Sequence, residues 1–167
     1  IETVKAELLD RGWSYATIAS SPFFHGNYFG LDMVTFVIKD YRKRPIGFSS
    51  RNTINVRSHE NPGGVAKYIN TPNTKIYNKS EALLGIDIAL HDAKRNGLWI
   101  VEGNGDVAAA QKSGLLNIVA TCGTALTYAH LTNLMALGIK QITLSFDIDK
   151  AGVAATSRVL ESDFPQG

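Results

Sequence analysis

Short apolar runs alternate with amphipathic stretches through the second half of the chain. Runs rich in Leu, Ile and Val predict buried strands, and apolar residues spaced three and four apart predict helices between them. The predicted strands are 98–101, 117–121 and 141–146, and the predicted helices are 80–96, 107–113, 128–137 and 150–160. Strands and helices that alternate in this way imply right-handed crossovers and a parallel sheet flanked by helices. The predicted fold class is therefore α/β.

The first half of the chain follows a less regular pattern. A short helix is expected over residues 1–10, followed by aromatic-rich loop and turn. Two strands are expected at 32–38 and 45–48, and residues 61–78, rich in Pro, Gly, Asn and Thr, are expected to be mostly irregular. We therefore predict a smaller mixed α/β subdomain over 1–79 and a catalytic subdomain over 80–167.

Charge is divided unevenly between these halves, although the net charge is only +2. Residues 1–97 carry thirteen Lys and Arg against nine Asp and Glu, whereas residues 98–167 carry four against six. The stretch 39–79 alone holds nine basic residues. A basic region beside an acidic one suits a metal-dependent enzyme that binds a polyanion, although an ordinary solvated surface has a similar composition.

Composition also excludes several classes of protein. No apolar run approaches the roughly 20 residues that cross a bilayer, so no membrane partner is expected. The single cysteine, Cys122, excludes an internal disulfide and a cysteine-based zinc site, and it is consistent with a cytoplasmic location. The sequence starts without Met, and we expect it to be a fragment of a longer protein.

Acidic residues follow the predicted strands where parallel strands would end. Glu102 directly follows the strand 98–101, Asp147 directly follows the strand 141–146, and Asp149 and Asp106 lie close by in sequence. Ligands of open parallel sheets bind at this edge, and neighbouring carboxylates repel one another unless cations bridge them. We therefore predict a Mg²⁺ (or Mn²⁺) site for phosphoryl transfer. For Asp106 and Asp149 alone, a helix N-cap is the alternative.

The segment 123–127, between the second strand and the next helix, consists of small and hydroxyl residues apart from Leu126. Its backbone N–H groups could meet an anion at the helix N-terminus. The alternative is a plain turn in which Thr127 caps the helix. Cys122, just before this segment, is expected to be a small buried side chain rather than a nucleophile.

Three motifs of the second half resemble the successive motifs of a Toprim domain, and more closely those of bacterial DnaG-type DNA primases. In the first half, two further segments resemble the strand pair and the loop-and-helix region of the same family. The Toprim-like motifs are VEGNGD (101–106), ATCGTALT (120–127) and FDIDKAG (146–152), and the others are FVIKD with IGF (36–40, 46–48) and KYINTPNT with YNK and LG (67–74, 77–79, 84–85). The Toprim motifs also occur in topoisomerases and nucleases, whereas the Lys67 loop is more specific to primases.

This resemblance, which extends from about residue 30 to 164, implies an RNA polymerase core that copies single-stranded DNA into short RNA primers from ribonucleoside triphosphates. It implies that Glu102 acts in catalysis and metal binding, that Asp147 and Asp149 bind metal, and that Asp106 supports catalysis. The nucleic-acid or nucleotide-binding residues that it implies are Arg51, Lys67, Lys79, Asn70, Gly123 and Thr124. A replicative helicase would be bound through a domain absent here.

The sequence departs from the family pattern at three places. Asn104-Gly105 stand where an aromatic residue and Met are common, Ile148 stands for a Gly, and Ser49-Ser50 stand for a Gly pair. These changes suggest a divergent member, of phage or plasmid origin. A further acidic motif is expected beyond Gly167, and zinc-binding and helicase-binding domains are absent, so we expect weak or no activity from the fragment alone.

Two other functions fit part of the pattern. A Toprim-family nuclease would use the same metal site to cut phosphodiesters, although the Lys67 to Lys79 segment argues against it. A non-catalytic DNA-binding fragment would keep the basic half and lack a complete acidic site.

Overall fold

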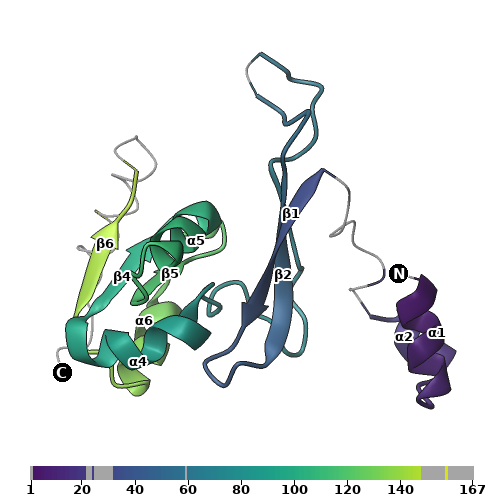
Figure 1. Cartoon of the computed structure of the whole chain (residues 1–167), viewed down its shortest axis with the longest axis horizontal. Coiled ribbons are helices and arrows are strands. Elements are labelled where there is room, and N and C mark those ends of the chain that lie inside the picture. Colours follow the sequence, from purple (N-terminus) through teal and green to yellow (C-terminus); the bar gives the residue numbers. More distant parts are fainter. Residues whose placement is uncertain (1, 22–23, 25–31, 59, 148–156, 158–167) are drawn as a thin grey trace. The chain divides into compact units, whose positions relative to one another are not determined.

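A computed structural model gives the structure of the chain (Figure 1). The structure describes residues 2–21, 24, 32–58, 60–147 and 157. The chain divides into two compact units. The first contains Ile1–Thr35 and Phe48–Pro72, and the second contains Phe36–Gly47 and Asn73–Gly167. The functional boundary expected between residues 79 and 80 stays a prediction.

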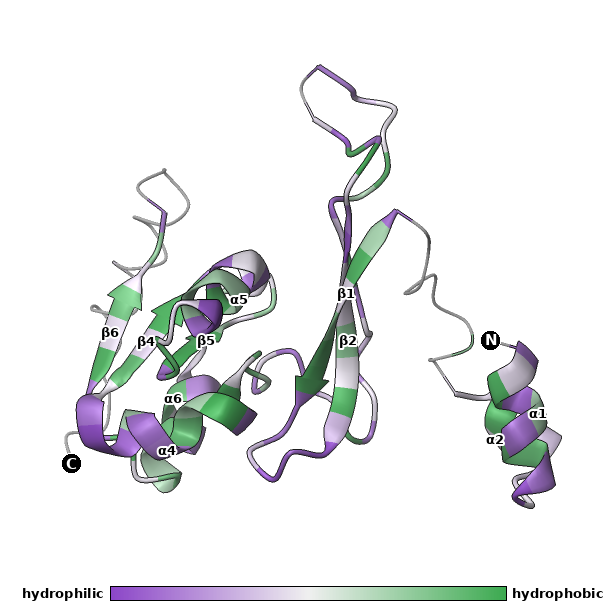
Figure 2. Cartoon of the chain, viewed as in Figure 1, coloured by the Kyte–Doolittle hydropathy of each residue, from purple (hydrophilic) through white to green (hydrophobic). Residues whose placement is uncertain are grey.

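The second unit is built on a parallel three-stranded sheet, as predicted. Its strands are β4 (Leu98–Val101), β5 (Ile118–Ala120) and β6 (Ile142–Ser145), in the order β5-β4-β6. The register places Val101 opposite both Ala120 and Ser145, so the three strands end at the same edge. These short apolar strands stand out in the hydropathy colouring of Figure 2.

Helices pack against both faces of this sheet, which confirms the predicted α/β class. The helices are α4 (Ile86–Asn96), α5 (Asn104–Lys112) and α6 (Tyr128–Ala136). On one face, Leu98 and Ile100 form a buried cluster with residues of α4 and α6, among them Leu134. On the other face, Val101 packs in a second cluster that includes Val107 of α5. Side chains alternate between the two faces because successive strand residues point in opposite directions.

Two predicted helix starts in this unit are wrong. Helix α4 begins at Ile86 rather than after Ser80, because Leu84 exchanges backbone hydrogen bonds with Ala120 and Gly85 then turns the chain with a φ of +90°. A Cβ at Gly85 would also lie 3.0 Å from Val107 Cγ1. Both the positive φ and this close contact therefore favour glycine at position 85. Helix α5 begins at Asn104 rather than at 107. The helix predicted over 150–160 lies outside the described residues.

A second three-stranded sheet has the order β1-β2-β3. Its strands are β1 (Met33–Lys39), β2 (Pro45–Asn52) and β3 (Tyr68–Asn70). Strand β2 is longer than predicted, and β3 was not predicted. Both misses have one cause: Ser49 and Ser50 are fully buried, and their hydroxyls bond to Asn70 Oδ1 (2.5 Å) and Thr35 Oγ1 (2.9 Å). Buried polar pairs thus replace the alternation of apolar and polar residues that reveals a strand.

The chain starts with two helices, α1 (Glu2–Asp10) and α2 (Tyr15–Ala19). Helix α1 was predicted, whereas the segment that forms α2 was expected to be loop. The hydroxyl of Ser14 accepts a hydrogen bond from the Thr17 amide and caps α2. Across the described residues, no helix combines the length and apolar character needed to cross a membrane.

Candidate functional site

Two of the predicted carboxylates lie beyond the ends of neighbouring strands. Glu102 directly follows β4 and is partly buried, and Asp147 lies two residues beyond the end of β6 and is exposed. Since β4 and β6 are paired in parallel, both residues leave the sheet at the same edge. Asp149 lies outside the described residues. Among the described ones, no group of three or more His, Cys, Asp and Glu could hold a metal, so the complete ligand set stays a prediction.

The turn between β4 and α5 fixes the position of a third carboxylate. Gly103 is the N-cap of α5 and Asp106 lies in its first turn, so Asp106 is not the N-cap. A Cβ built on Gly103 would overlap Asp106 Oδ2, which means that this carboxylate folds back over the turn. A negative charge in this first turn is also favoured by the helix dipole.

The chemistry of these residues fits a hard divalent cation. Glu102, Asp106 and Asp147 offer only carboxylate oxygens, which Mg²⁺ and Mn²⁺ prefer. The softer candidates nearby are poor ligands. Burial raises the pKa of the Cys122 thiol to about 11, and both ring nitrogens of His130 lie within hydrogen-bond distance of protein groups.

The turn between β5 and α6 brings together three of the predicted binding residues. Gly123 is exposed, and the hydroxyl of Thr124 lies 3.3 Å from the carbonyl oxygen of Lys79. Thr127 caps α6 as predicted: its hydroxyl accepts from the His130 amide, and its own amide donates to His130 Nδ1. Cys122 is buried, as expected, with a φ of +57°. The backbone of Lys79 therefore lies beside this turn.

The other predicted binding residues lie in the first unit. Arg51 and Lys67 are exposed, and Arg51 on β2 pairs with Tyr68 on β3, whose ring lies 5.9 Å from the guanidinium carbon. The backbone of Lys67 accepts a hydrogen bond from the Asn52 amide, which places Lys67 next to β2. Asn70 is instead partly buried and accepts the hydrogen bond of Ser49. The backbones of Arg51 and Lys67 therefore lie close together in the sheet, and a groove shared with Lys79 stays a prediction.

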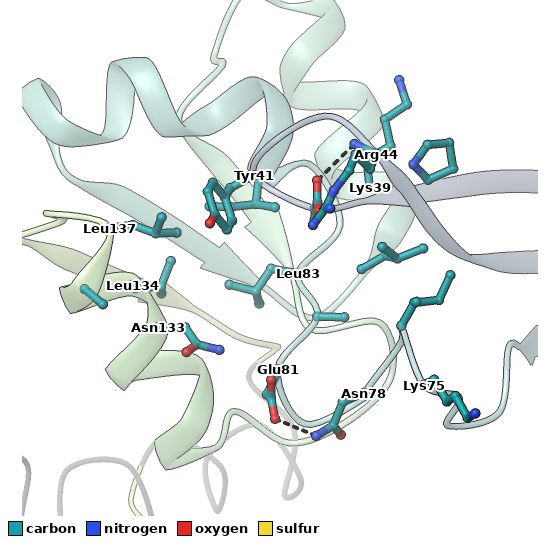
Figure 3. Close-up of a pocket in the computed structure, with 17 residues that line it drawn as sticks. Lys39, Tyr41, Arg44, Lys75, Asn78, Glu81, Leu83, Asn133, Leu134 and Leu137 are labelled. Carbon is teal, nitrogen blue, oxygen red and sulfur yellow. Dashed lines mark hydrogen bonds and ion pairs between the residues drawn. The ribbon is translucent and has the colours of Figure 1, made fainter.

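A pocket of about 700 Å³ lies elsewhere on the second unit (Figure 3). Its walls come from the turn between β1 and β2, from residues 75–83 and from the end of α6, and none of the predicted carboxylates lines it. Leu83 and Leu134 in its wall are already buried in the core, and Arg44 is paired with Asp40 at 2.6 Å. The pocket therefore offers little unsatisfied chemistry.

His130 was not among the residues for which the sequence predicted a role. The structure places it, fully buried, between the N-terminus of α6 and the segment that follows Lys79. The spacing Thr127-x-x-His130 was a usable signal, because a side chain at the third helical position can complete a capping box. The long-range contact could not have been found from the sequence, since it joins residues 48 positions apart.

Family models match both halves of the chain. The model of the Toprim domain matches residues 96–167, and that of the N-terminal domain of the DNA primase catalytic core matches residues 25–90. Toprim and primase proteins generally use divalent metal. The two matches occur in the order expected from the motifs.

Curated relatives of the chain are DNA primases. The primase of Streptomyces coelicolor is 39% identical over 131 residues, which are 75% of this chain and 20% of that protein. The primase of Lactococcus lactis is 36% identical over 150 residues, which are 86% of this chain and 23% of that protein. The chain thus spans about a fifth of the length of the curated relatives it matches.

Solved structures agree with these relatives. The RNA polymerase domain of Mycobacterium tuberculosis primase DnaG matches with a TM-score of 0.77 and 28% identity over 96% of this chain and 54% of that one. A DnaG primase catalytic domain bound to single-stranded DNA matches with a TM-score of 0.64 and 35% identity over 78% of this chain and 38% of that one. With both family segments, the relatives and the solved folds in agreement, the chain belongs to the DnaG-type DNA primase family, in which it matches the N-terminal part of the catalytic core and its Toprim domain.

Proposed function

We propose that this chain is part of a primase core that synthesises RNA primers on single-stranded DNA by metal-dependent nucleotidyl transfer, in DNA replication. One observation carries the proposal: a primase-core segment and a Toprim segment follow one another in a single chain. A Toprim nuclease would need only the second of these segments. The nuclease alternative is therefore not favoured.

The acidic edge of the parallel sheet is the proposed catalytic centre. Mg²⁺ or Mn²⁺ there would neutralise charge on the transferring phosphoryl group and assist the attacking hydroxyl. Glu102, Asp147 and Asp149 would hold the metal, with Glu102 also acting in catalysis. Asp106, folded back over Gly103, would add negative charge at the mouth of the same turn. We propose no zinc site in this fragment.

The basic residues are proposed to bind template and nucleotides. Arg51, Lys67 and Asn70 would contact the sugar-phosphate backbone of single-stranded DNA. A similar structure, a DnaG primase catalytic domain, is bound to single-stranded DNA. Lys79 with the Gly123–Thr124 turn would contact nucleic-acid or ribonucleoside triphosphate phosphates. Such contacts make affinity fall steeply with salt. We also propose that a replicative helicase binds to a part of the protein outside this sequence. The proposed location of the protein is the cytoplasm.

The Glu102→Gln substitution tests the catalytic centre. In the full-length parent it should lower primer synthesis by more than about a hundredfold, since it removes a charge that acts on the reacting phosphoryl group. DNA affinity should stay nearly unchanged, because it depends on the basic residues. Primer synthesis, DNA binding and a thermal melt are measured on the same preparation, with Glu60→Gln as the matched control. Full activity in a folded Glu102→Gln enzyme would contradict the assignment.

A metal titration separates the primase core from a non-catalytic DNA-binding fragment. The 167-residue chain should bind Mn²⁺, and Asp147→Asn should weaken that binding. A non-catalytic fragment would bind DNA and show no metal affinity that depends on Asp147.

A further inference from the structure

Three side chains near the start of α6 reach the backbone of the segment that carries Lys79. We call Thr124, Thr127 and His130 the latch. Their contacts are Thr127 Oγ1 with Ser80 O (2.6 Å), His130 Nε2 with Ala82 O (3.2 Å) and Thr124 Oγ1 with Lys79 O (3.3 Å). The Thr124 hydroxyl also lies 2.8 Å from Thr121 O, so its contact with Lys79 is the weaker of its two. The latch thus joins two segments 45 to 48 residues apart in sequence.

The partners of His130 fix its protonation and tautomer. Nε2 faces a carbonyl, which can only accept, so this nitrogen carries the hydrogen. Nδ1 lies 3.1 Å from the Thr127 amide, which can only donate, and 2.9 Å from the Thr127 hydroxyl, which can donate or accept, so Nδ1 as acceptor satisfies the amide. His130 is therefore neutral with its hydrogen on Nε2. Burial lowers the pKa of the ring, against a smaller opposing effect of the bond to Ala82, and so favours the same state.

The latch side chains bond to carbonyl groups that receive no hydrogen bond from the local backbone. Within the described residues, no backbone N–H outside the helices and strands donates to the carbonyls of Lys79, Ser80 or Ala82. On the other side of the peptide chain, the Lys79 amide donates to Asn73 Oδ1 at 3.0 Å. Side chains from elsewhere in the unit therefore define where the backbone of Lys79 lies.

A lysine needs such support if it is to bind at a defined place. Its ammonium is carried on a flexible four-carbon stem, so the side chain alone fixes little. A binding residue is held to its productive position by the groups that pack behind it. Anchoring the backbone on both sides of Lys79 restricts the volume that its ammonium can reach.

We propose that His130 is a positioning residue for Lys79, holding the Lys79–Ala82 segment beside the Gly123–Thr124 turn so that both act on one stretch of nucleic-acid backbone. The inference rests on the binding role proposed above for Lys79, Gly123 and Thr124. It differs from a plain structural role in one respect. A positioning residue acts through Lys79, so its effect on binding should vanish when the Lys79 ammonium is removed.

A double-mutant cycle with Lys79→Ala makes this test. His130→Asn places an acceptor near the Thr127 amide and is too short to reach Ala82, so it removes the latch contact and leaves the helix cap. His130→Gln restores a donor toward Ala82. Asn73→Ala removes the side-chain acceptor of the Lys79 amide without touching the cap. Affinity of the 167-residue chain for a labelled oligothymidylate at low salt is measured by anisotropy, with a melt of each variant.

We expect His130→Asn to weaken binding about three- to tenfold, the range for one positioned hydrogen bond. His130→Gln should recover most of that loss, and Asn73→Ala should show a smaller loss of the same kind as His130→Asn. In the Lys79→Ala background, His130→Asn should change affinity less than about twofold, because coupled residues are not additive.

Equal losses in both backgrounds would overturn the inference in favour of a structural role. So would a folded His130→Asn chain that binds like wild type while Lys79→Ala binds weakly. If His130→Asn does not fold, Asn73→Ala, which removes the acceptor of the Lys79 amide, decides by the same comparison. If Lys79→Ala alone leaves affinity unchanged, the binding role proposed for Lys79 is wrong and the positioning role falls with it.

Discussion

Two strand-to-helix turns leave the parallel sheet at the same edge and are built in opposite ways. Between β4 and α5 lie only Glu102 and Gly103, whereas residues 121–127 connect β5 to α6. The strands themselves end level, with Val101 opposite Ala120. The first turn carries acidic side chains and the second carries small and hydroxyl ones. The difference therefore lies in the turns and not in the sheet.

Each turn is held in place by a different set of hydrogen bonds. The short turn has local backbone bonds, in which the Gly103 carbonyl accepts from the amides of Asp106 and Val107. The long turn is fixed by hydrogen bonds to the Lys79–Ala82 segment. A short turn can thus expose charge at a defined point, whereas a long one needs partners from elsewhere in the chain.

After Glu102→Gln, the largest effect is expected from Gly103→Ala in the short turn. The new methyl group should displace the Asp106 carboxylate and lower both Mn²⁺ affinity and primer synthesis of the full-length parent by about tenfold or more, as mispositioned catalytic groups do. Stability should change by less than about 1 kcal/mol, because a φ of −93° is allowed for alanine and Asp106 is exposed.

Gly63→Ala is the control for this substitution, since a Cβ there would meet nothing within 4 Å. Wild-type metal affinity in Gly103→Ala, measured by Mn²⁺ titration, would show that the position of Asp106 is unimportant. A large loss of stability would instead show that the turn cannot relax around the methyl group.

The long turn should respond in the reverse way to Thr127→Ala. This substitution removes the N-cap of α6 and the bond to Ser80, and it should lower the free energy of unfolding by about 1–2 kcal/mol. Thr132→Ala is the matched control within the same helix, because its hydroxyl only bonds back to the Tyr128 carbonyl and is exposed. Urea unfolding measures both. Equal losses in the two variants would mean that the cap contributes nothing particular.

The sequence located the start of the first turn but missed its end at Asn104, and it located the second turn but not the contacts that hold it. The end of β4 could be predicted because Leu98–Val101 is an apolar run that stops at a charged residue, so the position of Glu102 at the sheet edge followed. The cap at Thr127 was also local and was predicted. The contacts of His130 and Thr124 were not, because they depend on how distant segments pack. The metal-binding roles of Glu102, Asp147 and Asp149 stay predictions.

The errors in the fold have a common physical origin. Ser80 looked like a helix cap on local pattern, but Leu84 pairs with Ala120, and that tertiary pairing delays the helix to Ile86. Strand β3 was hidden because its partner strand buries serine rather than apolar side chains. Both cases show tertiary contacts overriding local preference.

A smaller effect is expected from pH, again through the long turn. Burial lowers the pKa of His130 below its ordinary value of 6.5, so below about pH 6.5 the unfolded chain binds a proton that the folded chain does not. Stability contributed by His130 should therefore be complete above that pH and decline as pH falls toward the folded-state value. Carboxylates, with ordinary values of 3.8 and 4.5, titrate below most of this window.

The measurement is urea unfolding of wild type and His130→Asn at about pH 7.5 and about pH 5.5. The contribution of His130 is the difference between the two proteins in how much their stability changes between these pH values. Wild type should lose more stability between the two conditions than the variant does. Exposed His91 is present in both proteins, so its contribution cancels. An identical pH dependence would mean that the pKa of His130 is not lowered by folding.

The smallest effect concerns the reactivity of Cys122. Cys122 in the long turn and Glu102 in the short turn both lie just beyond the ends of paired strands. Glu102 is partly open to solvent, whereas Cys122 is 1% exposed and its pKa is raised to about 11 by burial. Thiolate is the reactive form, so the native chain at about pH 8 should react with a thiol reagent at only a small fraction of the rate of the same chain unfolded in guanidinium. Thr127→Ala should raise the native rate if the latch also keeps this turn closed, while Thr132→Ala should leave it unchanged. If Cys122 reacts as fast in the native chain as in the unfolded chain, the long turn opens readily. The two turns would then not differ in whether solvent reaches their reactive side chains.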